Sequence, residues 1–108
     1  MHAAAWSAPD GEILLVREDV GRHNALDKLV GGMATAGLNP IEGFAVITSR
    51  CSHEMAQKAI VAGIGVLAAM AAPTRMALAV ADAGGLALAA WAGGPRCAVL
   101  TQCHVIAG

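Results

Sequence analysis

The stretch FAVITS, Phe44 to Ser49, is a continuous run of apolar and β-branched residues. Such a run is typical of a strand in a sheet that is covered on both faces. A helix is expected directly after it, from about Ser52 to Gly63, and another apolar run follows at Val66 to Met70. A strand, a helix and a strand in this order predict a right-handed crossover between parallel strands.

The same rhythm continues toward the C-terminus. Pro73-Thr74 is an ordinary helix start, because threonine caps helices well, and it predicts a helix from Thr74 to about Ala83. Apolar runs at Leu86 to Ala92 and Cys97 to Thr101 predict two further strands. This half of the chain therefore adds a second βαβ unit to the first.

Toward the N-terminus the sequence predicts a hairpin and a helix. Short strands are expected at about Ala3 to Trp6 and Ile13 to Val16, joined by the turn Pro9-Asp10-Gly11. The helix from about Arg22 to Ala36 ends at Gly37, and its apolar residues recur at spacings of three and four: Ala25, Leu26, Leu29, Val30 and Met33. We predict an α/β fold, a single domain of residues 1–108 forming a three-layer sandwich with a mostly parallel sheet and an initial antiparallel hairpin.

Composition excludes several classes of protein. The chain has 108 residues and a net charge of -1, with scattered basic residues, so the footprint of a nucleic-acid-binding protein is missing. The longest uncharged stretch, Ala59 to Thr74, is shorter than the ~20 residues of a membrane span, and no signal peptide is apparent. The hydrophobic fraction of 56% hints that one apolar face is buried against another subunit or a missing domain.

The three cysteines do not form a recognisable site. Cys51, Cys97 and Cys103 cannot all pair within one chain, which indicates a reduced, cytosolic protein. A zinc deaminase needs His-x-Glu and Pro-Cys-x-x-Cys, whereas here His53 and Glu54 are adjacent and the last two cysteines are six residues apart. Cys51 stands at a helix start, where its pKa would be lowered and the thiol nucleophilic; the alternative is inert packing.

Charge gathers in Arg17 to Lys28, which holds six of the fifteen Lys, Arg, Asp and Glu residues. Gly21 allows a tight turn, and Arg22, His23 and Asn24 occupy the first helical turn. The unpaired N–H groups and the dipole of a helix start favour an anion there. Arginine adds a planar fork that suits phosphate or carboxylate. The segment therefore predicts an anion site.

A second interpretation of this segment stays open. Since His23 and Asp27 are four residues apart, the carboxylate is placed to orient the imidazole. Alternatively, Asp19 caps the helix, and Asp27 and Lys28 form exposed, solvated pairs with no further role.

A second polar cluster spans Thr48 to Lys58, at the end of the expected central strand. Ser49, Arg50 and Ser52 combine hydroxyls, a guanidinium and a helix start, which again suits an anion. Glu54 is placed to cap the first turn. Ligands of such sheets bind outside the carboxyl ends of the strands, where both clusters fall.

REDVGRHNALDKLVG, Arg17 to Gly31, resembles the signature of the formate dehydrogenase accessory sulfurtransferase family (FdhD). The resemblance continues in order through HAAA (His2 to Ala5), TSRCSHEMAQKA (Thr48 to Ala59) and APT (Ala72 to Thr74). It covers nearly the whole chain, and fifteen residues with so many polar identities are highly specific.

The resemblance implies a cytoplasmic maturation factor with a cytidine-deaminase-like core and no zinc chemistry. Members accept sulfur from a cysteine desulfurase as a persulfide and deliver it to the molybdenum or tungsten bis-guanine-dinucleotide cofactor of formate dehydrogenase, often as homodimers. Guanosine diphosphate is the expected mimic of that cofactor. The implied cofactor-binding residues are Asp19, Gly21, Arg22, His23, Asn24, Asp27, Lys28, Ser49, Arg50, Ser52, Glu54 and Thr74.

Two departures from the family pattern bear on activity. The CxxC that carries sulfur lies upstream of the HAAA segment, and this chain begins with Met1-His2, so it is either part of a longer protein or a shortened homologue. RCAVLT, Arg96 to Thr101, matches the family's Arg-x-Asn-Val-Tyr only in part. Three hypotheses follow: a cofactor-binding core that does not itself transfer sulfur, a non-enzymatic module that docks to the dehydrogenase or the desulfurase, and persulfide chemistry at Cys51.

Overall fold

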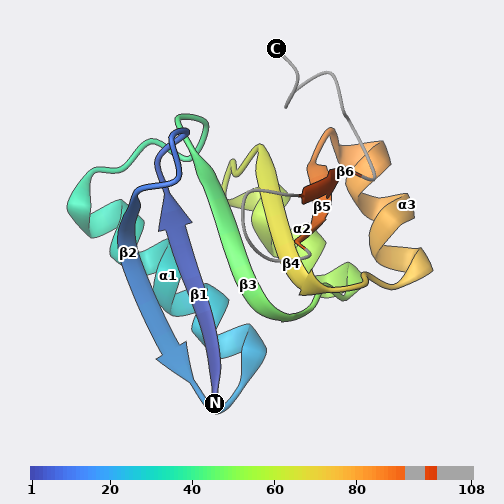
Figure 1. The fold of residues 1–108 in the computed structure, drawn as a ribbon, viewed down its shortest axis with the longest axis horizontal. Coiled ribbons are helices and arrows are strands. Elements are labelled where there is room, and N and C mark those ends of the chain that lie inside the picture. Colours follow the sequence, from blue (N-terminus) through green and yellow to red (C-terminus); the bar gives the residue numbers. More distant parts are fainter. Residues whose placement is uncertain (92–96, 100–108) are drawn as a thin grey trace.

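The fold is a mixed β-sheet carrying three helices, seen in a computed structural model that describes residues 1–91 and 97–99 (Figure 1). The strand order is β2-β1-β3-β4-β5-β6. The strands are β1 (His2–Ser7), β2 (Ile13–Asp19), β3 (Phe44–Arg50), β4 (Val66–Ala71), β5 (Ala87–Trp91) and β6 (Cys97–Val99); the helices are α1 (Arg22–Ala36), α2 (His53–Val61) and α3 (Arg75–Gly84).

The N-terminal hairpin forms as predicted. β1 pairs antiparallel with β2 from His2 opposite Asp19 to Ser7 opposite Ile13. Gly11 has a φ of 95°, which glycine adopts without strain, and the N–H of Glu12 donates to Oδ1 of Asp10 at 2.9 Å. The turn expected at this place is therefore confirmed.

Each helix begins and ends close to its predicted bounds. The apolar stripe of α1 is buried at Ala25, Leu26, Leu29 and Met33, and the helix ends at Gly37 in the left-handed conformation. The side chains of Ser52 and Thr74 cap α2 and α3, and each helix begins at the next residue. The segment Arg96 to Thr101 falls largely outside the described residues.

The parallel part of the sheet is smaller than predicted. Parallel pairing joins β3 to β4 and β4 to β5, whereas β1 pairs antiparallel with both β2 and β3, and β5 pairs antiparallel with β6. The α/β class and the initial hairpin are confirmed. The sheet is mixed because β1 lies inside it, between β2 and β3, so the hairpin contributes two antiparallel pairings.

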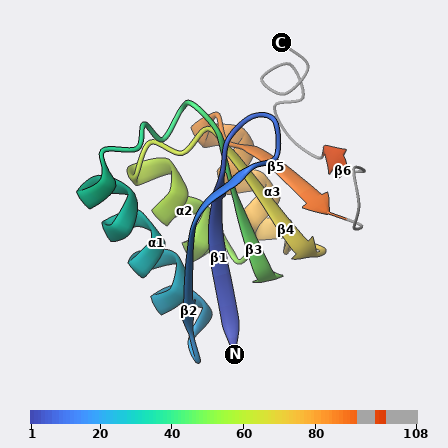
Figure 2. The same ribbon diagram turned by 60° about the vertical axis from the view of Figure 1, so that its left-hand side comes forward.

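All three helices lie on one face of the sheet (Figure 2). The connections from β2 to β3, from β3 to β4 and from β4 to β5 join strands of the same direction, and each moves the same way across the sheet. Right-handed crossovers that advance in one direction place every helix on the same side. The described residues therefore form two layers, and the predicted third layer is absent from this part of the chain.

The main core lies between the helices and this face of the sheet. Its largest fully buried side chains are Trp6, Leu26, Leu29, Ile47, Met55, Leu67, Leu86 and Leu88. A smaller apolar cluster, Val46, Ala68 and Ala89 with half-buried Phe44, belongs to the opposite face. Within the described ranges, none of the helices has the length and apolar character needed to cross a bilayer.

Candidate functional site

The polar residues singled out from the sequence meet at one edge of the sheet. β2, β3 and β4 run in the same direction, so their carboxyl ends lie at this edge and α1, α2 and α3 begin there (Figure 1). A backbone hydrogen bond ties two of the loops together, because the N–H of Thr74 donates to the carbonyl oxygen of Cys51 at 3.1 Å. We refer to residues 19–24, 50–54 and 74–75 as the polar edge.

Asp19 organises the loop between β2 and α1. Its Oδ1 accepts a hydrogen bond from the N–H of Gly21 at 2.9 Å, and its Oδ2 lies 2.7 Å from Nζ of Lys28. These contacts lower the pKa of the Asp19 carboxyl to about 2. Asp19 is therefore not the helix cap of the alternative interpretation; Gly21 holds that position, with a φ of -98° that any residue adopts.

Asp27 does not orient His23 in this structure. Its carboxylate oxygens lie 2.8 and 3.0 Å from Nζ of Lys58, in an ion pair that joins α1 to α2. Lys28 in turn donates to the carbonyl oxygen of Glu18 at 3.2 Å. The two lysines and their acidic partners thus stabilise the scaffold behind the edge.

The start of α2 is fixed by a serine cap. Oγ of Ser52 accepts from the N–H of Met55 at 3.3 Å, so Ser52 and not Glu54 is the capping residue. Ser49 is buried, and its hydroxyl donates toward Sδ of Met55 at 3.9 Å, on the helix side of the sheet. Arg50, the last residue of β3, is exposed.

The start of α3 adds a residue that the sequence reasoning missed. Oγ1 of Thr74 accepts from the N–H of Ala77 at 3.0 Å, as the sequence predicts, and exposed Arg75 is the first residue of the helix. Arg22 and half-buried His53 hold the same position in α1 and α2. The signal available in the sequence was this repeated basic residue directly after each expected helix start.

The arginines of the polar edge have no acidic partner among the described residues. The ion pairs in this part of the chain use Lys28 and Lys58, and neither involves Arg22, Arg50 or Arg75. Strands are about 4.8 Å apart, so the loops after β2 and β4, three positions apart in the sheet, are separated by roughly 15 Å. The edge therefore presents a row of free guanidinium groups long enough for an extended anion.

The expectation of a lowered pKa at Cys51 is wrong. The side chain is fully buried, its thiol donates to the carbonyl oxygen of Ser52 at 3.4 Å, and burial raises its pKa to about 11. Loss of hydration of the thiolate outweighs the field of the helix start. Cys51 is a neutral packing residue of the core.

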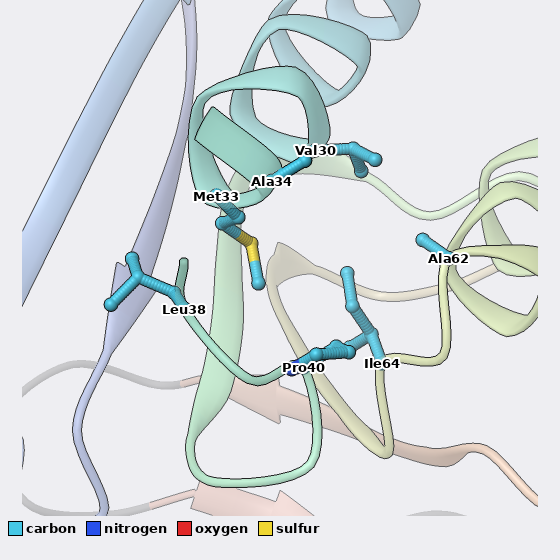
Figure 3. Close-up of a pocket in the computed structure, with 7 residues that line it drawn as sticks. All are labelled: Val30, Met33, Ala34, Leu38, Pro40, Ala62 and Ile64. Atoms are coloured by element: carbon cyan, nitrogen blue, oxygen red, sulfur yellow. The ribbon is translucent and has the colours of Figure 1, made fainter. Parts of the chain in front are cut away.

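An apolar pocket of about 110 Å³ lies at the opposite edge, where α1 and α2 end (Figure 3). The residues around it carry no charge, and Met33 points into the space between Leu38 and Ile64. Its lining is Val30, Met33, Ala34, Leu38, Pro40, Ala62 and Ile64. A charged ligand has no polar partner in such a pocket, which leaves the polar edge as the candidate site.

Comparisons with known proteins agree with the resemblance. The model of the FdhD/NarQ family matches residues 1–107. The chain is 54% identical over 102 residues to the sulfur carrier protein FdhD of Xanthomonas oryzae pv. oryzae (strain MAFF 311018), covering 94% of this chain and 36% of that protein. It is 50% identical to the FdhD of Variovorax paradoxus (strain S110), again over 94% of this chain and 37% of the relative.

A solved structure shares the fold. The crystal structure of a putative formate dehydrogenase accessory protein from Desulfotalea psychrophila superimposes with a TM-score of 0.87 and 27% sequence identity. The superposition covers 96% of this chain and 46% of the other. The chain therefore spans a little over a third of the curated relatives and less than half of the solved one.

Proposed function

Because this chain belongs to the FdhD/NarQ family, we propose that it is the cofactor-binding core of a sulfur carrier protein that serves formate dehydrogenase. The ligand is the molybdenum or tungsten bis-guanine-dinucleotide cofactor, held by its phosphates at the polar edge. The observation that carries the proposal is the basic first residue of each helix in the described part of the chain: Arg22, His53 and Arg75.

A basic residue at a helix start is unfavourable on its own. The N-terminus of a helix carries the positive end of the dipole, and cations there destabilise by roughly 0.3–1 kcal/mol. A basic first residue stands at the start of each described helix along this edge; Ser52 and Thr74 cap α2 and α3, whereas the first turn of α1 has no side-chain cap. Bound phosphate would turn each repulsion into an attraction.

The extent of the row favours a ligand with several phosphates. Arg22 and Arg75 follow strands roughly 15 Å apart, well beyond the reach of a single phosphate. A guanine dinucleotide carries a pyrophosphate between two sugars, and the bis form carries two of them. His23, Asn24, Ser52 and Thr74 supply neighbouring polar groups.

The proposal assigns sulfur transfer to cysteines other than Cys51, since that thiol is buried and protonated. A cysteine desulfurase is the proposed source of sulfur, the cytoplasm the place of action and a homodimer the working form. The cytidine-deaminase-like character of the core belongs to the same proposal. In this proposal the described core binds the cofactor, and cysteines other than Cys51 carry the sulfur.

The test is a thermal-shift titration with guanosine diphosphate. At 100 times its Kd a ligand adds about 2.7 kcal/mol, which raises the Tm of a domain of this size by 10 °C or more, as an order-of-magnitude estimate. Arg22→Ala and Arg75→Ala should lose most of this shift. Arg17→Ala, which removes the same charge from the middle of β2, should retain it. No shift at millimolar nucleotide would refute the proposal.

A second candidate function is a non-enzymatic module that docks to the dehydrogenase or the desulfurase. It is favoured by the exposed apolar side chains of Val20, two residues before Arg22, and Met76, directly after Arg75. Methionine and arginine together are common in protein interfaces. This alternative predicts that partner binding survives Arg22→Ala and Arg50→Ala, because the apolar contacts would remain.

A further inference from the structure

His2, the first residue of β1, lies next to the polar edge. β1 runs antiparallel to both β2 and β3, so its N-terminal end lies beside the carboxyl ends of those strands (Figure 1). His2 stands opposite Asp19, the last residue of β2. On the other side of β1, the N–H of Ala3 donates to Oγ1 of Thr48 at 3.0 Å, which holds the start of β1 against the end of β3. His2 therefore lies between the end of β2 and the end of β3.

The side chain of His2 faces the helices. Ala4 and Trp6 are buried in the core between the sheet and the helices, and strand alternation gives His2 the same orientation. Asp19 has this orientation as well, because its carboxylate forms an ion pair with Lys28 of α1. His2 is half-buried, so it lies on the side of the sheet where α1 and α2 begin and remains accessible to a ligand.

The imidazole of His2 has no hydrogen-bond or ion-pair partner among the residues that the structure describes. Asp19, which stands opposite in the sheet, is already engaged. Its Oδ1 accepts from the N–H of Gly21 at 2.9 Å, and its Oδ2 lies 2.7 Å from Nζ of Lys28. A histidine ring carries at least one N–H donor in every protonation state. That donor is therefore available to a bound molecule.

The position of His2 fills a gap in the row of basic residues along the polar edge. Arg22 follows β2 and Arg50 ends β3, and because β1 lies between these strands, their ends are two strand spacings apart, roughly 10 Å. An anion that extends from Arg22 to Arg50 passes over the start of β1. His2 supplies a hydrogen-bond donor at that place.

We propose that His2 is a further ligand-binding residue, whose imidazole donates a hydrogen bond to a phosphate oxygen of a nucleoside diphosphate lying along the polar edge between Arg22 and Arg50. The inference rests on the proposed function, since it adds one contact to the same anion. A hydrogen bond to a charged phosphate is stronger than one between neutral groups. Binding breaks no existing bond of the ring, because His2 has no partner within the described part of the chain.

Isothermal titration of guanosine diphosphate and of inorganic pyrophosphate tests this inference. His2→Ala removes the donor, and His2→Gln replaces the ring N–H by an amide N–H. The matched control is Thr48→Ala, which removes two hydrogen bonds to Ala3 at the start of β1 from the opposite face of the sheet and leaves the imidazole in place. The Tm of each variant without ligand verifies that the variant is folded.

The inference expects His2→Ala to bind both probes about tenfold more weakly than the unsubstituted chain, whereas His2→Gln and Thr48→Ala stay within about threefold of it. Unchanged affinity in His2→Ala would overturn the inference alone if Arg22→Ala still weakens binding. An equal loss in Thr48→Ala, or no recovery in His2→Gln, would also overturn it, because a looser start of β1 would then explain the effect. No binding of either probe to the unsubstituted chain would refute the proposed function and the inference together.

Discussion

Gly43 precedes β3 and lies against the end of β1, and its replacement by alanine tests the closest backbone contact of the fold. A Cβ at Gly43 would collide with the carbonyl oxygen of Ser7 and come within 3.1 Å of the Trp6 ring. Both obstacles are buried, and the first is backbone in the β1–β3 pairing. Gly43→Ala should therefore cost about 3 kcal/mol, the upper part of the range for overpacking, and lower the Tm by roughly 10–20 °C.

Two other glycines provide matched controls for urea unfolding. Gly31 lies on an exposed part of α1 with nothing within 4 Å of a Cβ, so Gly31→Ala should stabilise by about 0.5–1 kcal/mol. Gly84→Ala meets the far end of the Ile60 side chain, which is able to rotate, and should cost about 1 kcal/mol. A change below about 0.5 kcal/mol for Gly43→Ala would refute the observed approach of β1 to the start of β3.

Three further predictions concern the residues of the polar edge. Thr74→Ala should cost about 1 kcal/mol in urea unfolding through loss of the α3 cap, and Thr74→Ser should recover most of it. Cys51 should resist iodoacetamide in the folded protein at pH 8 and react on unfolding; rapid native labelling would contradict its burial and its pKa of about 11. Because the pKa of Asp19 falls from 3.8 to about 2 on folding, its contribution to stability is complete above about pH 4 and disappears as the pH falls through 2. Asp19→Asn should remove that part of the pH dependence, and identical unfolding profiles between pH 2 and 4 for both proteins would count against it.

Local patterns in the sequence predicted the elements well. The apolar residues Ala25, Leu26, Leu29 and Met33 are the ones that α1 buries, and Gly37 ends the helix in the left-handed conformation. Periodicity and end signals are properties of short segments, so they survive folding when packing agrees with them. The predicted strands likewise begin within a residue or two of the observed ones.

Periodicity and helix-end signals do not predict how many layers the fold has. The apolar run from Phe44 to Ser49 was interpreted as a strand covered on both faces, and its residues Val46 and Ile47, which point to opposite faces, are both buried, although the described helices all cover the side of Ile47. Which face a helix occupies depends on the order of the strands. β1 lies between β2 and β3, so it pairs with a strand far along the chain; the N–H of Ala3, for example, donates to the hydroxyl of Thr48. A pattern within a short segment does not encode a pairing between such distant residues.

The candidate site was predicted in outline and changed in detail. Sequence reasoning placed Arg22 and Arg50 at helix starts. Ser49 and Cys51, however, are buried, and Asp27 forms an ion pair with Lys58. These outcomes depend on tertiary neighbours. Arg75 was missed because Thr74 explained its helix start by itself, although the repeated basic first residue was visible in the sequence.

The most direct test of the central claim is isothermal titration of guanosine diphosphate into this chain and into its Arg22→Ala/Arg75→Ala double variant, with Arg17→Ala as the charge-matched control for a single substitution. The account predicts binding by the unsubstituted chain and by Arg17→Ala, and an affinity at least about tenfold weaker in the double variant, because each charge-assisted contact is worth roughly 1.5–3 kcal/mol. Equal affinity in the double variant and the unsubstituted chain would contradict a nucleotide site at the polar edge.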